Sequence, residues 1–227
     1  MKYTLSYLIK ISGRRIRRFF RNRNFLYQLD SNKVLFKDFI SKFSPIQSSH
    51  TLYGNYYLDS THQLHENSIV YSFGILNDVE FDSEVSNRHD CKVYMYDPTP
   101  ETIEFMKTQT DKNFVYFPKG VWIKDESLRF GKPSLGGSSS VFIENENAYF
   151  DAECLSLKTI LDQNKHEQID VLKMDIEGAA LPIVEYMINE NIFPTQLVVE
   201  FERYSKTQEE TKKLISKIKR ICDVYLS

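Results

Sequence analysis

The sequence predicts an α/β fold with a mainly parallel sheet. Short apolar runs that are rich in β-branched and aromatic residues alternate along the chain with segments of helical spacing. This alternation is typical of βαβ units, whose strands pair in parallel. The 227 residues are enough to bury a sizeable core without disulfides or a structural metal. The three cysteines, Cys91, Cys154 and Cys222, lie far apart, which favours free thiols in a reducing compartment.

The expected strands and helices follow one another between residues 68 and 226. The main strands are expected at residues 68–74, 92–97, 113–118, 169–175 and 196–201, with shorter ones at 127–130, 140–143 and 154–157 and a last one starting at 223–226. Helices are expected at residues 79–88, 101–107, 179–189 and 208–222. A stretch rich in glycine and serine at residues 135–140 predicts a flexible loop.

The N-terminal part differs from the rest in charge. The first 29 residues hold eight basic side chains and no acidic one, whereas the remainder holds 21 basic and 31 acidic residues. Leu5, Leu8, Ile9 and Ile16 recur at helical spacing, which predicts an amphipathic helix. Two interpretations stay open: peripheral contact with an anionic membrane surface or acidic partner, and packing on the chain's own domain.

The same N-terminal part is expected to stand apart from the main domain. A second short helix is expected at residues 32–43, and a polar connector rich in tyrosine at residues 48–66. We therefore divide the chain into a basic, helical extension at residues 1–66 and an α/β domain at residues 67–227.

Composition and spacing exclude several classes of protein. A net charge of −2 argues against a dedicated nucleic-acid binder. No apolar run is long enough for a transmembrane helix, and no signal peptide is recognisable. We expect a cytoplasmic protein, with membrane association through the basic segment left open. His50, His62 and His65 lack the spacing of metal ligands on a helix, so no metal site is expected.

Five residues stand at or near the carboxyl ends of the expected strands, where ligands bind in parallel sheets: Gly74, Asp97, Gly120, Asp175 and Glu200. An acid at the end of the second strand accepts hydrogen bonds from a nucleoside ribose in many such sheets, although a helix cap is the alternative for Asp97. The sequence lacks the G-x-G-x-x-G, P-loop and G-x-S-x-G motifs. The pattern favours a nucleoside ligand without phosphates, of which S-adenosylmethionine is the commonest.

Residues 169–178, IDVLKMDIEG, resemble the signature of the FkbM-type S-adenosylmethionine-dependent methyltransferases. Further matches in order and spacing are Val70–Gly74, Tyr96–Pro100, Lys119–Trp122 and Leu197–Phe201. The resemblance covers roughly residues 68–201. It implies a Rossmann-like class I methyltransferase fold with helices on both faces of the sheet. It also implies O-methylation of a sugar, glycoconjugate or natural-product hydroxyl, hence a role in polysaccharide modification with a small-molecule or saccharide acceptor. A homo-oligomer stays open.

The resemblance also implies roles for individual residues. Contacts with the cofactor are expected from Ser72, Phe73, Gly74, Asp97, Pro98, Gly120, Val121 and Asp175. Asp175 is the first candidate for the reacting centre, with Glu177 and Glu200 as further catalytic candidates. A cap of the following helix is the alternative for Asp175. For Glu200, an acceptor-side or metal-assisting role and a purely structural one stay open.

The sequence departs from the family pattern at several positions. Leu76 stands where relatives usually have a second glycine, and Ala180 stands where many have another acid. The residues up to 227 leave little room for a final antiparallel strand, so either that hairpin is abbreviated or the N-terminal region covers the edge. These departures keep a non-catalytic binding or scaffold module open as an alternative. A glycosyltransferase is more distant, because no D-x-D motif ends a strand.

Overall fold

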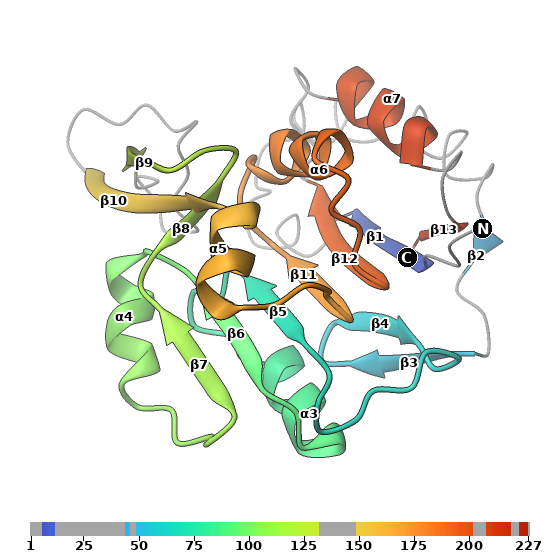
Figure 1. The fold of residues 1–227 in the computed structure, drawn as a ribbon, viewed down its shortest axis with the longest axis horizontal. Coiled ribbons are helices and arrows are strands. Elements are labelled where there is room, and N and C mark those ends of the chain that lie inside the picture. Colours follow the sequence, from blue (N-terminus) through green and yellow to red (C-terminus); the bar gives the residue numbers. More distant parts are fainter. Residues whose placement is uncertain are drawn as a thin grey trace, which may run out of the picture.

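The structure is a computed structural model that describes residues 6–11, 44–45, 49–131, 149–201, 208–218 and 223–226. Its centre is an eight-stranded sheet in the order β2-β13-β1-β12-β11-β5-β6-β7, and all neighbouring strands pair in parallel (Figure 1). The strands are β1 (Ser6–Ile11), β2 (Ser44–Pro45), β5 (Val70–Phe73), β6 (Val93–Tyr96), β7 (Phe114–Phe117), β11 (Val171–Met174), β12 (Gln196–Phe201) and β13 (Asp223–Leu226).

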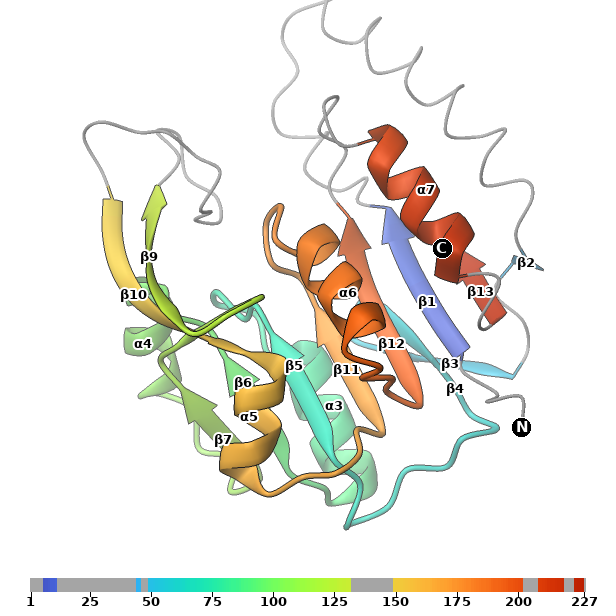
Figure 2. The same ribbon diagram turned by 45° about the horizontal axis from the view of Figure 1, so that its top comes forward.

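Helices cover both faces of this sheet (Figure 2). The helices are α3 (Glu80–His89), α4 (Pro100–Met106), α5 (Leu157–Asn164), α6 (Ala180–Asn189) and α7 (Gln208–Ile218). Side chains of α3 and α4 pack into one apolar cluster, and side chains of α5, α6 and α7 pack into another. Every residue of β5 and β11 is buried, as expected for central strands of a parallel sheet. The Rossmann-like α/β fold is therefore confirmed.

A three-stranded sheet connects β7 with α5. It has the order β8-β10-β9, in which β10 (Tyr149–Ser156) is parallel to β8 (Gly120–Trp122) and antiparallel to β9 (Glu126–Gly131). The sequence predicted β9 but not β8, and β10 begins before the expected residue 154. The strand expected at residues 140–143 and the loop expected at 135–140 lie outside the described residues.

The expected connector contains a β-hairpin, formed by β3 (His50–Tyr53) and β4 (Tyr56–Asp59). The sequence predicted a connector here and did not predict these two strands. Gly54 and Asn55 form the two-residue turn, and Gly54 has a φ of 54°. A Gly-Asn pair between β-prone residues favours such a turn. The hairpin packs in the same apolar cluster as α3 and thereby covers part of that face of the sheet.

Residues 6–11 form strand β1, which corrects the helix expected for this part of the basic segment. β1 lies between β12 and β13 and is parallel to both. A short apolar run fits either a helix or a strand by spacing alone, and pairing with two strands decides the outcome. The N-terminal region thus occupies the sheet edge that the sequence left open.

The other predictions for the N-terminal region stay open. The rest of the basic segment and the helix expected at residues 32–43 lie outside the described residues. The domain boundary at residue 66 stays a prediction, although β1 and β2 pair within the large sheet. Within the described ranges, no helix is both long and apolar enough to span a membrane.

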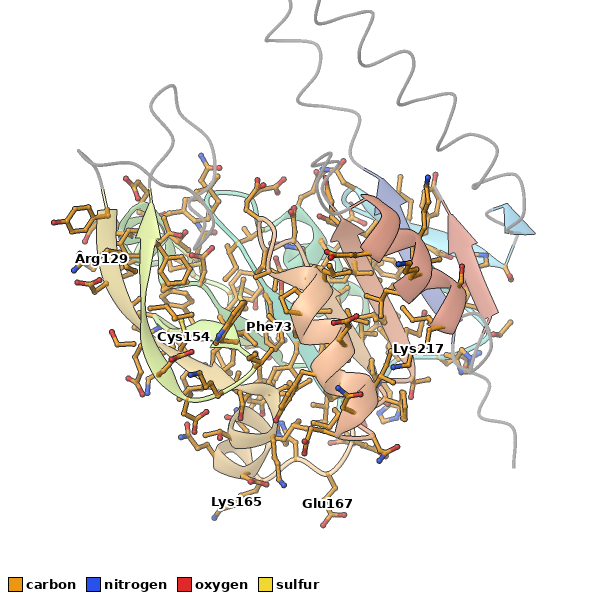
Figure 3. The ribbon with its side chains drawn as sticks, turned by 90° about the horizontal axis from the view of Figure 1, so that it is seen from above. Phe73, Arg129, Cys154, Lys165, Glu167 and Lys217 are labelled. Carbon is orange, nitrogen blue, oxygen red and sulfur yellow. The ribbon has the colours of Figure 1, made fainter. Side chains whose placement is uncertain are left out.

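The other main strands and helices agree with the expected ranges to within a few residues, but α5 was not predicted. A serine at the helix start could have indicated α5, because the Ser156 side chain caps the helix by accepting a hydrogen bond from Thr159 N. Figure 3 shows Phe73 inside the molecule, whereas Lys165 and Glu167, just after α5, project outward. Phe73 is fully buried in the cluster that α5 helps to form.

Candidate functional site

The loop after β5 packs directly on the end of β11. Gly74 has a φ of 82°, and a Cβ on this residue would lie 2.0 Å from the carbonyl oxygen of Asp175. Only glycine fits such a close approach of two backbones. The order of strands along the chain reverses between β5 and β11, and ligands of open α/β sheets bind in the crevice outside such a point. Gly74 and Asp175 therefore lie where a ligand is expected.

The carboxylate of Asp97, at the end of β6, fixes the shape of this loop. Its Oδ2 atom accepts hydrogen bonds from the backbone N–H groups of Ile75 and Leu76, at 2.8 and 2.9 Å. Its Oδ1 atom accepts one from Thr99 N at 2.8 Å, just before α4 begins. A carboxylate offers about four acceptor positions, so about one remains for a ligand. The structure thus gives Asp97 a local structural role and leaves room for a ligand contact.

Leu76 adopts a backbone conformation that favours glycine. Its φ is 53°, in the left-handed region. For a residue with a Cβ this conformation costs roughly 1–2 kcal/mol. The loop therefore keeps a glycine-like backbone at the expense of strain, which is typical of ligand-binding segments.

A buried lysine supports the same loop from within the sheet. Lys173, on β11, is only 4% exposed, and its Nζ atom donates a hydrogen bond to the carbonyl oxygen of Gly74 at 2.5 Å. Asp82, on α3, is also buried, and burial raises the pKa of its carboxyl group while the charge of Lys173 opposes that rise. Because the two groups carry opposite charges in one buried environment, their attraction offsets part of the free-energy cost of removing each charge from water.

Asp175 is linked to the N-terminal hairpin through Tyr56. The hydroxyl group of Tyr56 donates a hydrogen bond to Asp175 Oδ2 at 2.8 Å and lies 3.5 Å from Glu200 Oε2. Burial, followed by the charges of Asp175 and Glu200, raises the pKa of Tyr56 far above its usual range. The structure therefore brings together two of the predicted catalytic acids, at the ends of the neighbouring strands β11 and β12.

The family model described as the methyltransferase FkbM domain matches residues 63–222. The chain belongs to the FkbM methyltransferase family. A solved structure, methyltransferase FkbM from Methylobacillus flagellatus KT, is 11% identical over 57% of this chain and 32% of that chain, with a TM-score of 0.38. This chain thus matches about a third of that protein's length. No curated protein matches this chain.

The third predicted acid of this FkbM family member lies in a tight turn. Glu177 precedes Gly178, which has a φ of 79°, and Ala179 N donates a hydrogen bond to the carbonyl oxygen of Ile176. Helix α6 has Ala179 at its N-cap and no side chain that caps it. Asp175 is therefore not the helix cap that the sequence left open as its alternative role.

Other predicted cofactor residues occupy different surroundings. Ser72 is fully buried and pairs in register with Lys173, whereas the Phe73 ring packs edge-on against Tyr96 on the opposite face of the sheet. Gly74, the next residue, has a positive φ and lies against the backbone of Asp175. For Ser72 and Phe73, a cofactor contact stays a prediction.

Gly120 and Val121 lie in β8, and Pro98 lies between Asp97 and Thr99. A Cβ on Gly120 would lie 2.5 Å from the sulfur of Cys154 on β10. This close packing explains why a glycine stands at position 120. The expected proximity of Gly120, Val121 and Pro98 to a cofactor stays a prediction.

A separate cavity of about 260 Å³ lies between the β3–β4 hairpin, the end of α3 and the start of β12. Its walls include Tyr53, Asp59, His62, His89 and Gln196. None of the predicted site residues lines it. Among the described residues, no group of three or more His, Cys, Asp or Glu side chains is arranged to hold a metal ion.

Sequence reasoning missed three residues of the site: Tyr56, Asp82 and Lys173. Lys173 lies inside the ten-residue motif at residues 169–178. A lysine in the middle of a strand that is expected to be buried was a usable signal of a role in the site. The sequence contained no comparable signal for Tyr56, which lies 119 residues from Asp175.

Proposed function

We propose that this FkbM family member is an S-adenosylmethionine-dependent methyltransferase that methylates a hydroxyl oxygen of a sugar, glycoconjugate or natural product. The observation that carries the proposal is the meeting of Gly74, Asp97 and Asp175 at the carboxyl ends of the neighbouring strands β5, β6 and β11. Asp97 holds the loop that Gly74 begins, and Gly74 packs on the backbone of Asp175. Family membership supplies the reaction class.

The residues at these strand ends fit the cofactor. Asp97 keeps about one acceptor position that suits a ribose hydroxyl, and its carboxylate holds the backbone loop that follows Gly74. The carboxylate of Asp175 suits a positive charge nearby. When bound, S-adenosylmethionine supplies an electrophilic methyl group on a sulfonium ion.

Asp175 is the residue we assign to the acceptor hydroxyl. Methyl transfer is an in-line displacement, so a large part of catalysis is the orientation of the acceptor. A hydroxyl is poorly acidic, and a carboxylate within hydrogen-bonding reach can orient it and accept its proton. Within the described part of the chain, Asp175 Oδ1 accepts no hydrogen bond, whereas Oδ2 is held by Tyr56. Glu200 and Glu177 are the second and third candidates for this role.

A non-catalytic module that binds the same cofactor is the alternative function. It is favoured by Leu76, whose side chain stands at a glycine position of the family pattern, and by the buried Ala180 at the start of α6. Cofactor binding without methyl transfer to any acceptor would support it.

The test is single-turnover methyl transfer from isotopically labelled S-adenosylmethionine to a panel of saccharide and natural-product alcohols. Asp175→Asn should reduce the rate by roughly 10²–10⁴-fold, the usual contribution of a general base, with a much smaller effect on cofactor affinity. Glu200→Gln serves as the matched comparison. Near-wild-type turnover of Asp175→Asn, together with inactivity of Glu200→Gln, would place the base on β12 and contradict this assignment.

A further inference from the structure

We infer that Tyr56 is a positioning residue that aims the negative charge of Asp175 at the cofactor's sulfonium. The inference rests on the proposed function, because it concerns the same site. It gives the β3–β4 hairpin, which lies outside the strands that carry the family resemblance, a part in the reaction.

The hairpin tip is held firmly enough to position a side chain. A Cβ on Gly54 would lie 2.7 Å from the backbone nitrogen of Phe81, so the turn lies directly on the start of α3. The Tyr56 ring packs edge-on against the Phe81 ring, with centroids 5.6 Å apart. Tyr56 itself is only 7% exposed. Its ring therefore has little freedom to move relative to α3.

The single hydroxyl proton of Tyr56 discriminates between the two acids. The distance of 2.8 Å to Asp175 Oδ2 is that of a good hydrogen bond, whereas 3.5 Å to Glu200 Oε2 is at the limit. The raised pKa of Tyr56 keeps this proton in place throughout the pH range in which enzymes work. Tyr56 thus fixes one oxygen of Asp175, and the geometry of the carboxylate then determines where the other oxygen lies.

The aromatic ring of Tyr56 also contacts the support of the glycine loop. Lys173 Nζ lies 5.5 Å from the ring centroid, within the range of a cation–π interaction. The same ammonium group binds the carbonyl oxygen of Gly74. One side chain of the hairpin therefore touches both the acid at the end of β11 and the lysine that holds the loop after β5.

The test compares the affinities of S-adenosylmethionine and S-adenosylhomocysteine, measured by calorimetry. The two ligands differ by one methyl group and its positive charge, so their affinity ratio reports the charge that faces the sulfonium. A purely structural defect should weaken both ligands alike and leave the ratio unchanged. Tyr56→Phe removes only the hydroxyl and should reduce the preference for S-adenosylmethionine by about three- to tenfold. Tyr57→Phe, on the same strand, is the matched control and should keep the wild-type ratio.

Asp175→Asn provides a second measurement that leaves Tyr56 intact. It should reduce the same ratio, and adding Tyr56→Phe to it should change the ratio no further, because Tyr56 acts through Asp175. An unchanged ratio in Tyr56→Phe or in Asp175→Asn, with a wild type that binds both ligands, overturns the inference alone. A wild type that binds neither ligand overturns the proposed function as well, so the two failures are distinguishable.

Discussion

The two halves of the site are held together in different ways. At the ends of β5 and β6, backbone N–H groups within about twenty residues of Asp97 surround its carboxylate. At the ends of β11 and β12, Asp175 receives its hydrogen bond from a tyrosine side chain 119 residues earlier in the chain. The first half is built from backbone donors 2 to 22 residues from Asp97, and the second half from a side-chain contact that spans 119 residues.

This difference matters for what each half can do. Backbone donors fix a carboxylate rigidly and occupy most of its acceptor positions, which suits a binding role. A single side-chain donor leaves the rest of a carboxylate available, which suits contact with a reacting group. Substitutions in the first half should therefore change stability and cofactor affinity, whereas those in the second half should change mainly the chemistry and the response to charge.

The junction between the halves should be the most sensitive position. Gly74→Ala places a Cβ against the Asp175 carbonyl at a positive φ, and should lower the free energy of unfolding by about 3 kcal/mol or more. Gly178→Ala is the control, since it also has a positive φ and should cost only about 1–2 kcal/mol. Urea denaturation measures both. Equal stability of the two variants would contradict the close contact at Gly74.

Asp97→Ala tests the first half. Removal of the carboxylate leaves three backbone N–H groups without their acceptor, so the free energy of unfolding should fall by about 2–3 kcal/mol. Affinity for S-adenosylmethionine should fall by about 10- to 100-fold. Asp125→Ala, which removes an exposed carboxylate that binds Ser156 N, should leave that affinity unchanged. Normal cofactor binding by Asp97→Ala would remove Asp97 from the proposed site.

Leu76→Gly should have a smaller effect, and in the opposite direction. Glycine relieves the left-handed strain at this position but loses more chain entropy on folding, for a net gain of about 0.5–1 kcal/mol in the free energy of unfolding. Leu76→Ala retains the strain and should show no gain. Thermal and urea denaturation of the two variants decide the point, and a destabilised Leu76→Gly would mean that the side chain contributes more than the strain costs.

The smallest effect is expected outside both halves. Burial lowers the pKa of His166, whose Nδ1 atom lies 2.7 Å from the Tyr71 hydroxyl. The unfolded chain therefore binds a proton more readily than the folded one, and stability should decrease as pH falls below about 6.5. In His166→Asn this decrease should be smaller, as measured by urea denaturation at several pH values. An identical pH dependence in the variant would show that His166 does not contribute.

The comparison of the two halves also shows which parts of the fold and of the site could be predicted from the sequence. The loop of Gly74, the acid Asp97 and the motif around Asp175 are contiguous with their strands, so periodicity and resemblance located them. β1 was predicted as a helix, because its pairing with β12 and β13 is a property of the assembled sheet. Tyr56 was missed for the same reason, since its partner is close only after the hairpin has packed on α3.

The central claim is that a nucleoside-type cofactor binds across the two halves, and the most direct measurement is a crystal structure with S-adenosylhomocysteine. The account predicts ribose hydroxyls against Asp97, the backbone of Gly74 along the amino-acid portion, and the sulfur atom on the side of Asp175 and Tyr56. Binding at another place, such as the cavity lined by His62 and Gln196, would contradict it.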